Sequence, residues 1–286
     1  QAPTAQSLNA IAPFQRAGWG YFFLGSAAVM PRPDLNEELD DSQLTGTVKL
    51  AYHPNDNTLT YASFATGYKA GGTNTDRILP SLSPLFDAEK SRSAEIGIKH
   101  DFEEYGVRVN AAAHYTQISD FQATTFTGTG FNLQNAGDII VKGVELEATW
   151  LMTENTKLHA VASRTLANFD EFKRGTCWVA YTWHTGIDDP GRVEPNDPFR
   201  SRDGDRVGFE PQNSLSLMLN HYFEVGNYPA SASIDYQYTG DVFLDDANDP
   251  YKYADDFSLF NVRVSFTIPQ WDSEIIAWSR NVFDEE

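Results

Sequence analysis

YASFATGYKAGG, residues Tyr61–Gly72, is the stretch that decides the fold. It mixes small residues and aromatic rings with one lysine, and it stops at the glycine pair Gly71-Gly72. It holds few of the bulky aliphatic side chains that fill the core of a soluble protein. The turn sequence HPNDN (His53–Asn57) precedes it, and a long irregular segment follows it. We interpret it as the upper half of a β-strand that begins near Thr58, between a tight turn and a long loop.

The same two-residue period continues along the rest of the chain, and no helical pattern interrupts it convincingly. In Gly106–Ile118, for example, Val107 and Val109 alternate with Arg108 and Asn110. Such alternation is typical of strands with one apolar and one polar face. It predicts ten strands, at about 44–52, 58–69, 94–102, 106–118, 144–150, 155–167, 213–223, 230–239, 260–267 and 273–282.

The connections between these strands are short and long in strict alternation. The short ones are 53–57, 103–106, 153–156, 224–227 and 269–272, and the long ones are roughly 70–90, 119–136, 168–211 and 241–255. All tight turns therefore lie at one end of the sheet. Outer-membrane barrels have this layout, with short periplasmic turns and long extracellular loops. A soluble sandwich has turns every 8–12 residues without such a polarity.

Strand length and the placement of aromatic residues also favour a membrane barrel. Several predicted strands reach ten residues, near the roughly 9–11 that cross a bilayer at a tilt. The polar face, which carries Glu145 and Glu147, could instead be the solvated side of a soluble sheet. Aromatic side chains gather at strand ends, as expected of rings at the two membrane interfaces; they are Tyr52, Phe102, Tyr105, Trp150, Tyr222, Phe223, Tyr228, Trp271 and Trp278.

Composition excludes several classes of protein. Lys and Arg number 21 against 40 Asp and Glu, a net charge of -19, which disfavours binding to nucleic acid. The one cysteine, Cys177, allows no internal disulfide and no zinc-type spacing. No run approaches the roughly 18 apolar residues of a membrane helix, and Gln1–Ala10 lacks the basic region of a signal peptide.

Five blocks resemble, in this order, the C-terminal half of TonB-dependent outer-membrane receptors. They are YASFATGYKAGGTN (Tyr61–Asn74), SAEIGIKHDF (Ser93–Phe102), RVNAAAHYTQISDFQ (Arg108–Gln122), NAGDIIVKGVELEATW (Asn135–Trp150) and SRNVFDEE (Ser279–Glu286). The last block resembles the end of the family's penultimate strand. The resemblance runs from about Leu44 to the end of the chain, and together the blocks are specific.

The resemblance implies an all-β fold, an antiparallel transmembrane β-barrel of which this chain supplies about ten of 22 strands. In that family the barrel encloses an N-terminal plug, and a TonB box couples uptake to the TonB-ExbB-ExbD complex. Neither plug, TonB box, signal peptide nor final strand is recognisable, so we expect a piece of a longer polypeptide. We assign residues 1–43 to an irregular segment, expected as an extracellular loop, and 44–286 to a partial barrel.

The loop at 168–211 is the most informative about a ligand. Its aromatic residues could form a stacking platform for a sugar or an aromatic chelator, and its arginines could hold an anion. Alternatively, these side chains pack the loop onto itself or lie at the outer-leaflet interface. The candidate ligand-binding residues are Trp178, Tyr181, Trp183, His184, Arg200, Arg202 and Arg206.

Other polar groups offer weaker hypotheses. The acidic loop Phe243–Asp256 could hold calcium, but its spacing departs from the EF-hand pattern, and bridging to lipopolysaccharide or plain solvation is the alternative. Glu145 and Glu147 could suggest paired-carboxylate hydrolysis or, in a polar lumen, serve as wall charges. The six histidines show no ligand spacing, and no nucleophile elbow occurs. We expect no catalytic residue, no metal and no cofactor.

The leading hypothesis is an outer-membrane receptor of a Gram-negative bacterium. It would take up a scarce, bulky nutrient such as a ferric siderophore or cobalamin in an energised step. Its expected partners are TonB-ExbB-ExbD, an extracellular small-molecule ligand, and outer-membrane lipid with lipopolysaccharide. The alternatives are a passive porin or adhesin barrel, or a secreted soluble glycan-binding β-protein.

Overall fold

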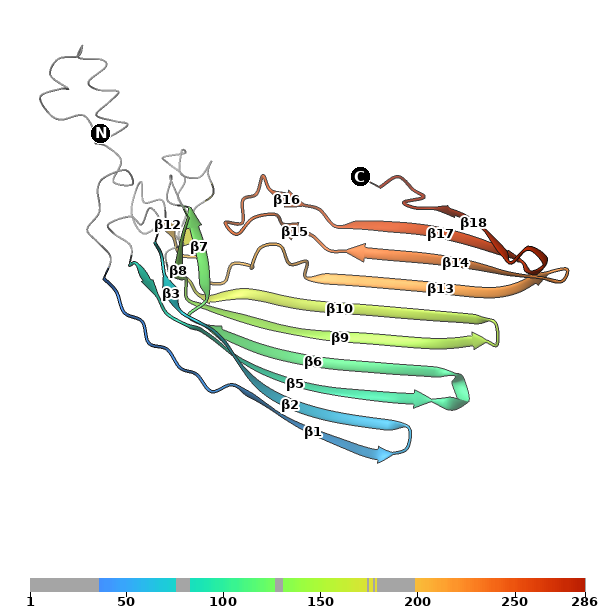
Figure 1. The fold of residues 1–286 in the computed structure, drawn as a ribbon, viewed down its shortest axis with the longest axis horizontal. Helices are drawn as coiled ribbons and strands as arrows, with labels where there is room; N and C mark the ends of the chain where they lie inside the picture. The colour runs from blue at the N-terminus through green and yellow to red at the C-terminus, as the bar shows by residue number, and fades with distance from the viewer. Residues whose placement is uncertain are drawn as a thin grey trace, which may run out of the picture. The chain divides into compact units, whose positions relative to one another are not determined.

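A computed structural model describes residues 36–75, 83–126, 131–173, 175–176, 178 and 199–285. Ten antiparallel strands lie side by side in chain order, with β1 and β18 at the two edges (Figure 1). The predicted number of sheet strands is therefore confirmed. They are β1 (Gly46–Asn55), β2 (Thr58–Lys69), β5 (Glu89–Phe102), β6 (Val107–Ser119), β9 (Asp138–Thr153), β10 (Thr156–Glu171), β13 (Asn213–Val225), β14 (Tyr228–Thr239), β17 (Phe257–Ile268) and β18 (Ser273–Ser279).

Several strand boundaries differ from those predicted. β9 begins at Asp138 and β10 continues to Glu171, beyond the alternating apolar residues on which the predictions rested. Their outer ends still pair, since Phe169 lies opposite Ile139, and a register shift follows before Glu171. Backbone pairing thus extends the strands past the end of their apolar pattern.

Short turns join the strands at one end of the sheet, as predicted (Figure 1). Two of them are 3₁₀ turns, η3 (Glu103–Tyr105) and η4 (Pro269–Trp271), and each ends in a left-handed residue, Gly106 at φ 62° and Asp272 at φ 46°. In the described part of the chain, helix is limited to these turns. None of the described helices is long and apolar enough to cross a membrane.

The register places one apolar and one polar face on the sheet. Ala111 lies opposite Leu146, which lies opposite Ala162, whereas Asn110 lies opposite Glu147 on the other face. Many large side chains of the apolar face are exposed rather than packed in a core, among them Val48, Leu50, Phe64, Ile96, Ile98, Val144, Leu146, Ile234 and Val264. A sheet with this apolar face exposed to solvent is suited to contact with lipid.

Most of the aromatic residues noted in the sequence lie at the turn end of the strands. Phe102 is the last residue of β5, Tyr52 and Trp150 lie three residues before the ends of β1 and β9, and all three are exposed. Tyr105 and Trp271 lie in the 3₁₀ turns themselves and are also exposed. They form one belt at this end, as expected of rings at a membrane interface.

The long connections contain short ladders where the sequence predicted irregular loops. Each is a two-stranded pairing too short to show a period in the sequence, and backbone pairing rather than side-chain pattern creates it. The pairs are β3 (Gly72–Thr73) with β4 (Leu85–Phe86), β7 (Gln122–Phe126) with β8 (Phe131–Asn135), β11 (Gly175–Thr176) with β12 (Phe199–Arg200), and β15 (Val242–Phe243) with β16 (Tyr253–Ala254).

The chain divides into two compact units. The first comprises the segment up to Leu44 with Tyr68–Lys90 and Asp120–Ala136, and it holds β3, β4, β7 and β8. The second holds the body of the sheet and everything after Gly137. Of the irregular N-terminal segment, only its last part lies among the described residues, where 36–45 carry no regular structure.

Candidate functional site

Two long loops of the second unit meet at the ends of β10, β13, β14 and β17. We call the described residues 168–173, 175–176, 178, 199–212 and 240–256 the loop cluster. The loop cluster is attached to the sheet, since the N–H of Val207 donates to the carbonyl of Ala167 in β10 (2.9 Å), and its two loops are joined by the N–H of Phe209, which donates to the carbonyl of Phe243 (2.8 Å). Backbone hydrogen bonds of this kind fix both loops relative to the strands.

Arg202 lies at the centre of the loop cluster and is only 1% exposed. Its guanidinium group donates to the carbonyl of Asp246 and, from Nη2, to Oδ1 of Asn248 (3.0 Å). From Nε it donates to Asp205 (3.3 Å), and its Cζ lies 4.5 Å from the ring centroid of Phe169. One side chain therefore joins the loop after β12 to the loop between β15 and β16.

Arg200 and Arg206 reinforce the same assembly. Arg200 pairs with Asp205, and its Cζ lies 5.6 Å from the ring centroid of Trp178. Arg206 pairs with Asp241 (Nη1 to Oδ2, 2.5 Å) and also donates from Nη2 to the carbonyl of Asp241 (2.9 Å). Both arginines thus meet a carboxylate of the loops.

The ionisation of these groups follows from their partners. The pKa of Asp241 is lowered because Arg206 and then the hydroxyl of Tyr253 hydrogen-bond to its carboxylate. The pKa of Asp203 is lowered by Lys173 and by the N–H of Phe172. Burial lowers the pKa of Arg202, although Asp205 opposes that effect.

The structure brings together four of the seven predicted ligand-binding residues: Trp178, Arg200, Arg202 and Arg206. The three guanidinium groups point into the loop cluster, where protein carboxylates and carbonyls accept most of their hydrogen bonds, although Nε of Arg200 is buried without a hydrogen-bond partner among the described residues. This is the arrangement that the alternative interpretation, a loop packed onto itself, anticipated for the arginines. The other candidates, Tyr181, Trp183 and His184, lie outside the described residues.

Sequence reasoning missed a group of exposed apolar side chains on the same loops. Tyr251 is 83% exposed and Phe209 60%, and Leu244 and Tyr253 are also exposed. Phe209 has φ 65°, a conformation that bulky residues rarely adopt and that clusters at ligand clamps. The acidic residues of Phe243–Asp256 drew attention away from its two tyrosines, which could have been recognised in the sequence as candidate ligand contacts.

The carboxylates of the acidic loop serve its own turns. Asp245 Oδ1 accepts the N–H of Asp249 (3.0 Å), and its Oδ2 accepts Nζ of Lys252 (3.2 Å). Asp249 in turn accepts the N–H of Tyr251 (2.9 Å). Among the residues that the structure describes, no group of three or more His, Cys, Asp or Glu side chains could hold a metal ion.

The polar face of the sheet carries paired charges. Glu147 accepts a hydrogen bond from Asn110 (2.9 Å) and lies 4.0 Å from Nε2 of His159. Nearer the turn end, Arg108 donates two hydrogen bonds to the carboxylate of Asp101, from Nε to Oδ1 (2.5 Å) and from Nη2 to Oδ2 (2.8 Å). These contacts follow the strand register, as expected of charges on a polar wall.

In the first unit, amide side chains hold the loop ladders together. Asn74 donates to the carbonyl of Leu133 (2.7 Å) and accepts its N–H (2.8 Å). Gln122 donates to the carbonyls of Ala70 (2.8 Å) and Asp87 (3.1 Å). These amide side chains form hydrogen bonds with backbone N–H and carbonyl groups that have no partner in a neighbouring strand.

Comparison with known proteins gives a consistent result. A family model described as "TonB dependent receptor-like, beta-barrel" matches residues 24–282. The pesticin receptors of Yersinia enterocolitica and Yersinia pestis are 35% identical over 129 residues, which is 44% of this chain and 18% of theirs. The chain therefore spans less than a fifth of the length of these curated relatives.

Solved structures share the fold. The ferric yersiniabactin uptake receptor of Yersinia pestis superposes with a TM-score of 0.64 at 21% identity, over 85% of this chain and 33% of that one. The ferric preacinetobactin receptor of Acinetobacter baumannii gives a TM-score of 0.59 at 14% identity, over 84% and 32% of the two chains. At these identities the likeness concerns the fold, a partial barrel of the same kind.

Proposed function

The chain belongs to the TonB-dependent receptor β-barrel family, and from this premise we propose that it forms the ligand-capturing part of an energised nutrient receptor. Receptors of this family lie in the outer membrane of Gram-negative bacteria, and that is where this chain resides. The family is one of transport receptors. We further propose that this protein has no catalytic activity of its own.

The proposed ligand is a ferric siderophore or a similarly bulky chelate. The support comes from relatives, since the pesticin receptors are 35% identical over 129 residues, and a ferric yersiniabactin receptor shares the fold. Uptake would be coupled to TonB-ExbB-ExbD through a part of the receptor other than this barrel segment. Outer-membrane lipid and lipopolysaccharide would surround the apolar face, and residues 1–43 would contribute an extracellular loop.

The loop cluster divides the candidate residues by role. Trp178, with Tyr181, Trp183 and His184, would contact the ligand, and the exposed Phe209 and Tyr251 would join them. Arg200, Arg202 and Arg206 would act mainly by positioning, because their guanidinium groups bind loop carboxylates and carbonyls. Aromatic rings suit a bulky chelate since they offer large contact areas at low conformational cost.

The observation that carries the proposal is the family match over nearly the whole chain. It removes the secreted soluble protein among the alternatives, because this family resides in the outer membrane. Uptake through the proposed receptor requires energy, whereas uptake through a passive porin does not, and this difference can be tested.

The test uses the full-length receptor that contains this chain, expressed in a Gram-negative strain without its own siderophore receptors. Uptake of radioactive iron from a panel of ferric siderophores is measured with TonB present and deleted. We expect uptake of at least one chelate with TonB, and none without it or after collapse of the proton gradient. Equal uptake in the TonB-deleted strain would identify a passive pore instead.

A further inference from the structure

We propose that the apolar face of the sheet carries a binding site for a phosphorylated lipid of the outer leaflet. Arg92, Lys142 and Arg164 would hold the phosphate, and a hollow among alanines beside them would hold an acyl chain. The proposal depends on the outer-membrane placement of the chain and is independent of the nutrient that the receptor imports.

The three cations share the apolar face at the loop end of neighbouring strands. Lys142 on β9 lies opposite Tyr115 on one side and Leu166 on the other. Arg164 on β10 lies opposite Val144, and is therefore a diagonal neighbour of Lys142, with Cα atoms about 7–8 Å apart.

Arg92 approaches the pair from β5. The hydroxyls of Ser93 and Thr116 lie 2.8 Å apart, which aligns β5 with β6 and places Arg92 two strands from Lys142. Two strand spacings give about 10 Å across the sheet, and with an offset of two residues along the strands the Cα atoms of Arg92 and Lys142 are about 12 Å apart. The long side chains of both residues can reach one phosphate group or two phosphates of a single headgroup.

These cations are exposed and mostly uncommitted. Arg92, Lys142 and Arg164 are all exposed, and none of them forms an ion pair with a described residue. Arg164 makes one long hydrogen bond, to Asn213 (3.5 Å). From these cations to the turns, the apolar face of β5, β6, β9 and β10 carries no carboxylate, and Asp138 and Asp170 lie beyond them toward the loops. In a chain of net charge -19, three unpaired cations on a lipid-facing surface call for an anionic partner.

Their height matches a membrane interface. Counted from the turn ends of their strands at Phe102 and Thr153, Arg92 and Lys142 stand about 24–26 Å up the membrane normal for strands tilted by about 45°. The apolar band of such barrels is about 25 Å tall. Arg164 starts lower, and its side chain can extend toward the headgroups. Since the long loops are extracellular, this is the outer leaflet.

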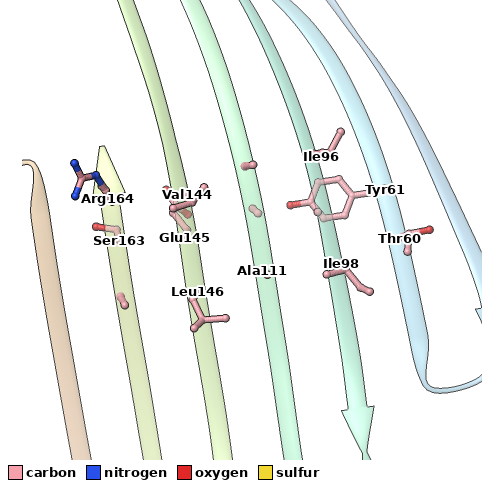
Figure 2. Close-up of a pocket in the computed structure, with 14 residues that line it drawn as sticks. Thr60, Tyr61, Ile96, Ile98, Ala111, Val144, Glu145, Leu146, Ser163 and Arg164 are labelled. Carbon is pink, nitrogen blue, oxygen red and sulfur yellow. The ribbon is translucent and has the colours of Figure 1, made fainter. Parts of the chain in front are cut away.

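An apolar hollow adjoins the cations on the side of the turns. It has a volume of about 730 Å³ and spans β2, β5, β6, β9 and β10, with Arg164 at the edge nearest the loops (Figure 2). Alanines contribute to the floor of this hollow, and larger side chains at the same positions would fill it. The lining side chains of the apolar face include Ile96, Ile98, Ala111, Ala113, Leu146 and Ala162. A cationic edge above an apolar hollow fits a lipid that joins phosphate to acyl chains.

The test uses the full-length receptor, stripped of lipid in detergent and titrated with lipid A, the phosphorylated anchor of lipopolysaccharide. Binding is followed by native mass spectrometry. The variant R92Q/K142Q/R164Q is compared with K49Q/K99Q/K157Q, which removes three cations from the polar face for the same change in net charge. Heat-dependent migration on a gel establishes that each variant is folded.

We expect roughly fivefold weaker binding for each cation removed, and so about a hundredfold for the triple variant, with the control near the parent. Ala113→Phe, which fills the hollow without changing charge, should also weaken binding. If the triple variant does not fold, the single variant Arg92→Gln carries the same test at about fivefold.

Three results would overturn the proposal. The first is parental affinity in both the triple variant and Ala113→Phe. The second is equal binding of lipid A and its dephosphorylated form, which would exclude a phosphate site. The third is full displacement of lipid A by millimolar inorganic phosphate, which would indicate a site for free anions.

Discussion

At the scale of single residues, Arg202 is one of the two largest side chains that are fully buried in the described structure. It is charged, almost fully buried, and hydrogen-bonded to a carboxylate, a backbone carbonyl and an amide from two loops. Removing one partner of such a buried set leaves the others without hydrogen bonds, and that loss exceeds the net contribution of the intact pair. Its position explains how two irregular loops keep one arrangement.

Arg202→Met should therefore loosen both loops while leaving the sheet intact. We expect a local loss of about 2–4 kcal/mol, seen as faster proteolysis of residues 241–256 in intact cells and faster hydrogen exchange there. Arg263→Met, which breaks an exposed pair with Glu274, is the matched control and should change little. Equal protease resistance of Arg202→Met and the parent would show that the loops hold together without this residue.

The acid response of the loop cluster follows from Asp203 and Asp241. Their folded pKa values lie below the unfolded value of about 3.9. Each carboxylate therefore stabilises the folded loops fully above that value, and the contribution is lost as the pH falls through the lower folded pKa.

We accordingly expect hydrogen exchange in residues 199–256, corrected for its intrinsic pH dependence, to be constant between about pH 5 and 8 and to accelerate below about pH 4. The double variant D203N/D241N should show less of this acid response. A transition near neutral pH would mean that other groups control the loops.

At the scale of elements, each strand has one face for lipid and one for the polar interior. Leu146 and Glu147 are adjacent in β9 yet face opposite sides, because Leu146 pairs with Ala111 and Glu147 with Asn110. The tyrosine ring of Tyr61 crosses Gly97 on the polar face, where an added Cβ would lie 2.5 Å from its Cζ. A glycine thus admits an aromatic ring between strands.

A charged residue should be tolerated on the polar face of the sheet and should destabilise the folded barrel on the apolar face. Ala148→Arg places a cation on the apolar face of β9, five residues from its turn end at Thr153 and so near the middle of the apolar band, and should cost about 2–4 kcal/mol. Val161→Arg adds the same charge on the polar face, opposite Glu147, and should be nearly neutral. The measurement is the fraction of receptor that is folded in outer membranes, and equal fractions for the two variants would contradict the assignment of the faces.

At the scale of the whole molecule, charge should influence which ligands arrive fastest. The net charge is -19, and carboxylates outnumber cations in the loop cluster, whose arginines are already paired. A negative surface slows the approach of anions, and salt screens that repulsion over about 8 Å at physiological ionic strength.

A ferric complex that carries three negative charges should therefore bind the full-length receptor severalfold faster at physiological than at low ionic strength. A neutral ferric hydroxamate should show no such dependence and is the control. Stopped-flow quenching of tryptophan fluorescence measures both rates. Faster binding of the anionic complex at low salt would indicate a cationic entrance that the loop cluster does not contain.

The strands, their number and the polarity of their connections could all be predicted from the sequence. This is because alternation with a period of two and turn composition are local properties of the chain. The period in Gly106–Ile118 and the turn at His53–Asn57 needed no distant contact to be recognised.

Only the tertiary structure decided what the polar residues do. Arg200, Arg202 and Arg206 could be assigned to a ligand from composition, yet the structure pairs them with carboxylates and carbonyls of the loops, as far as 44 positions away in the case of Arg202. The grouping of Arg92, Lys142 and Arg164 likewise depends on strand register. Long-range pairing has no local signature, because the partner of a charged side chain is set by which strands become neighbours and in which register.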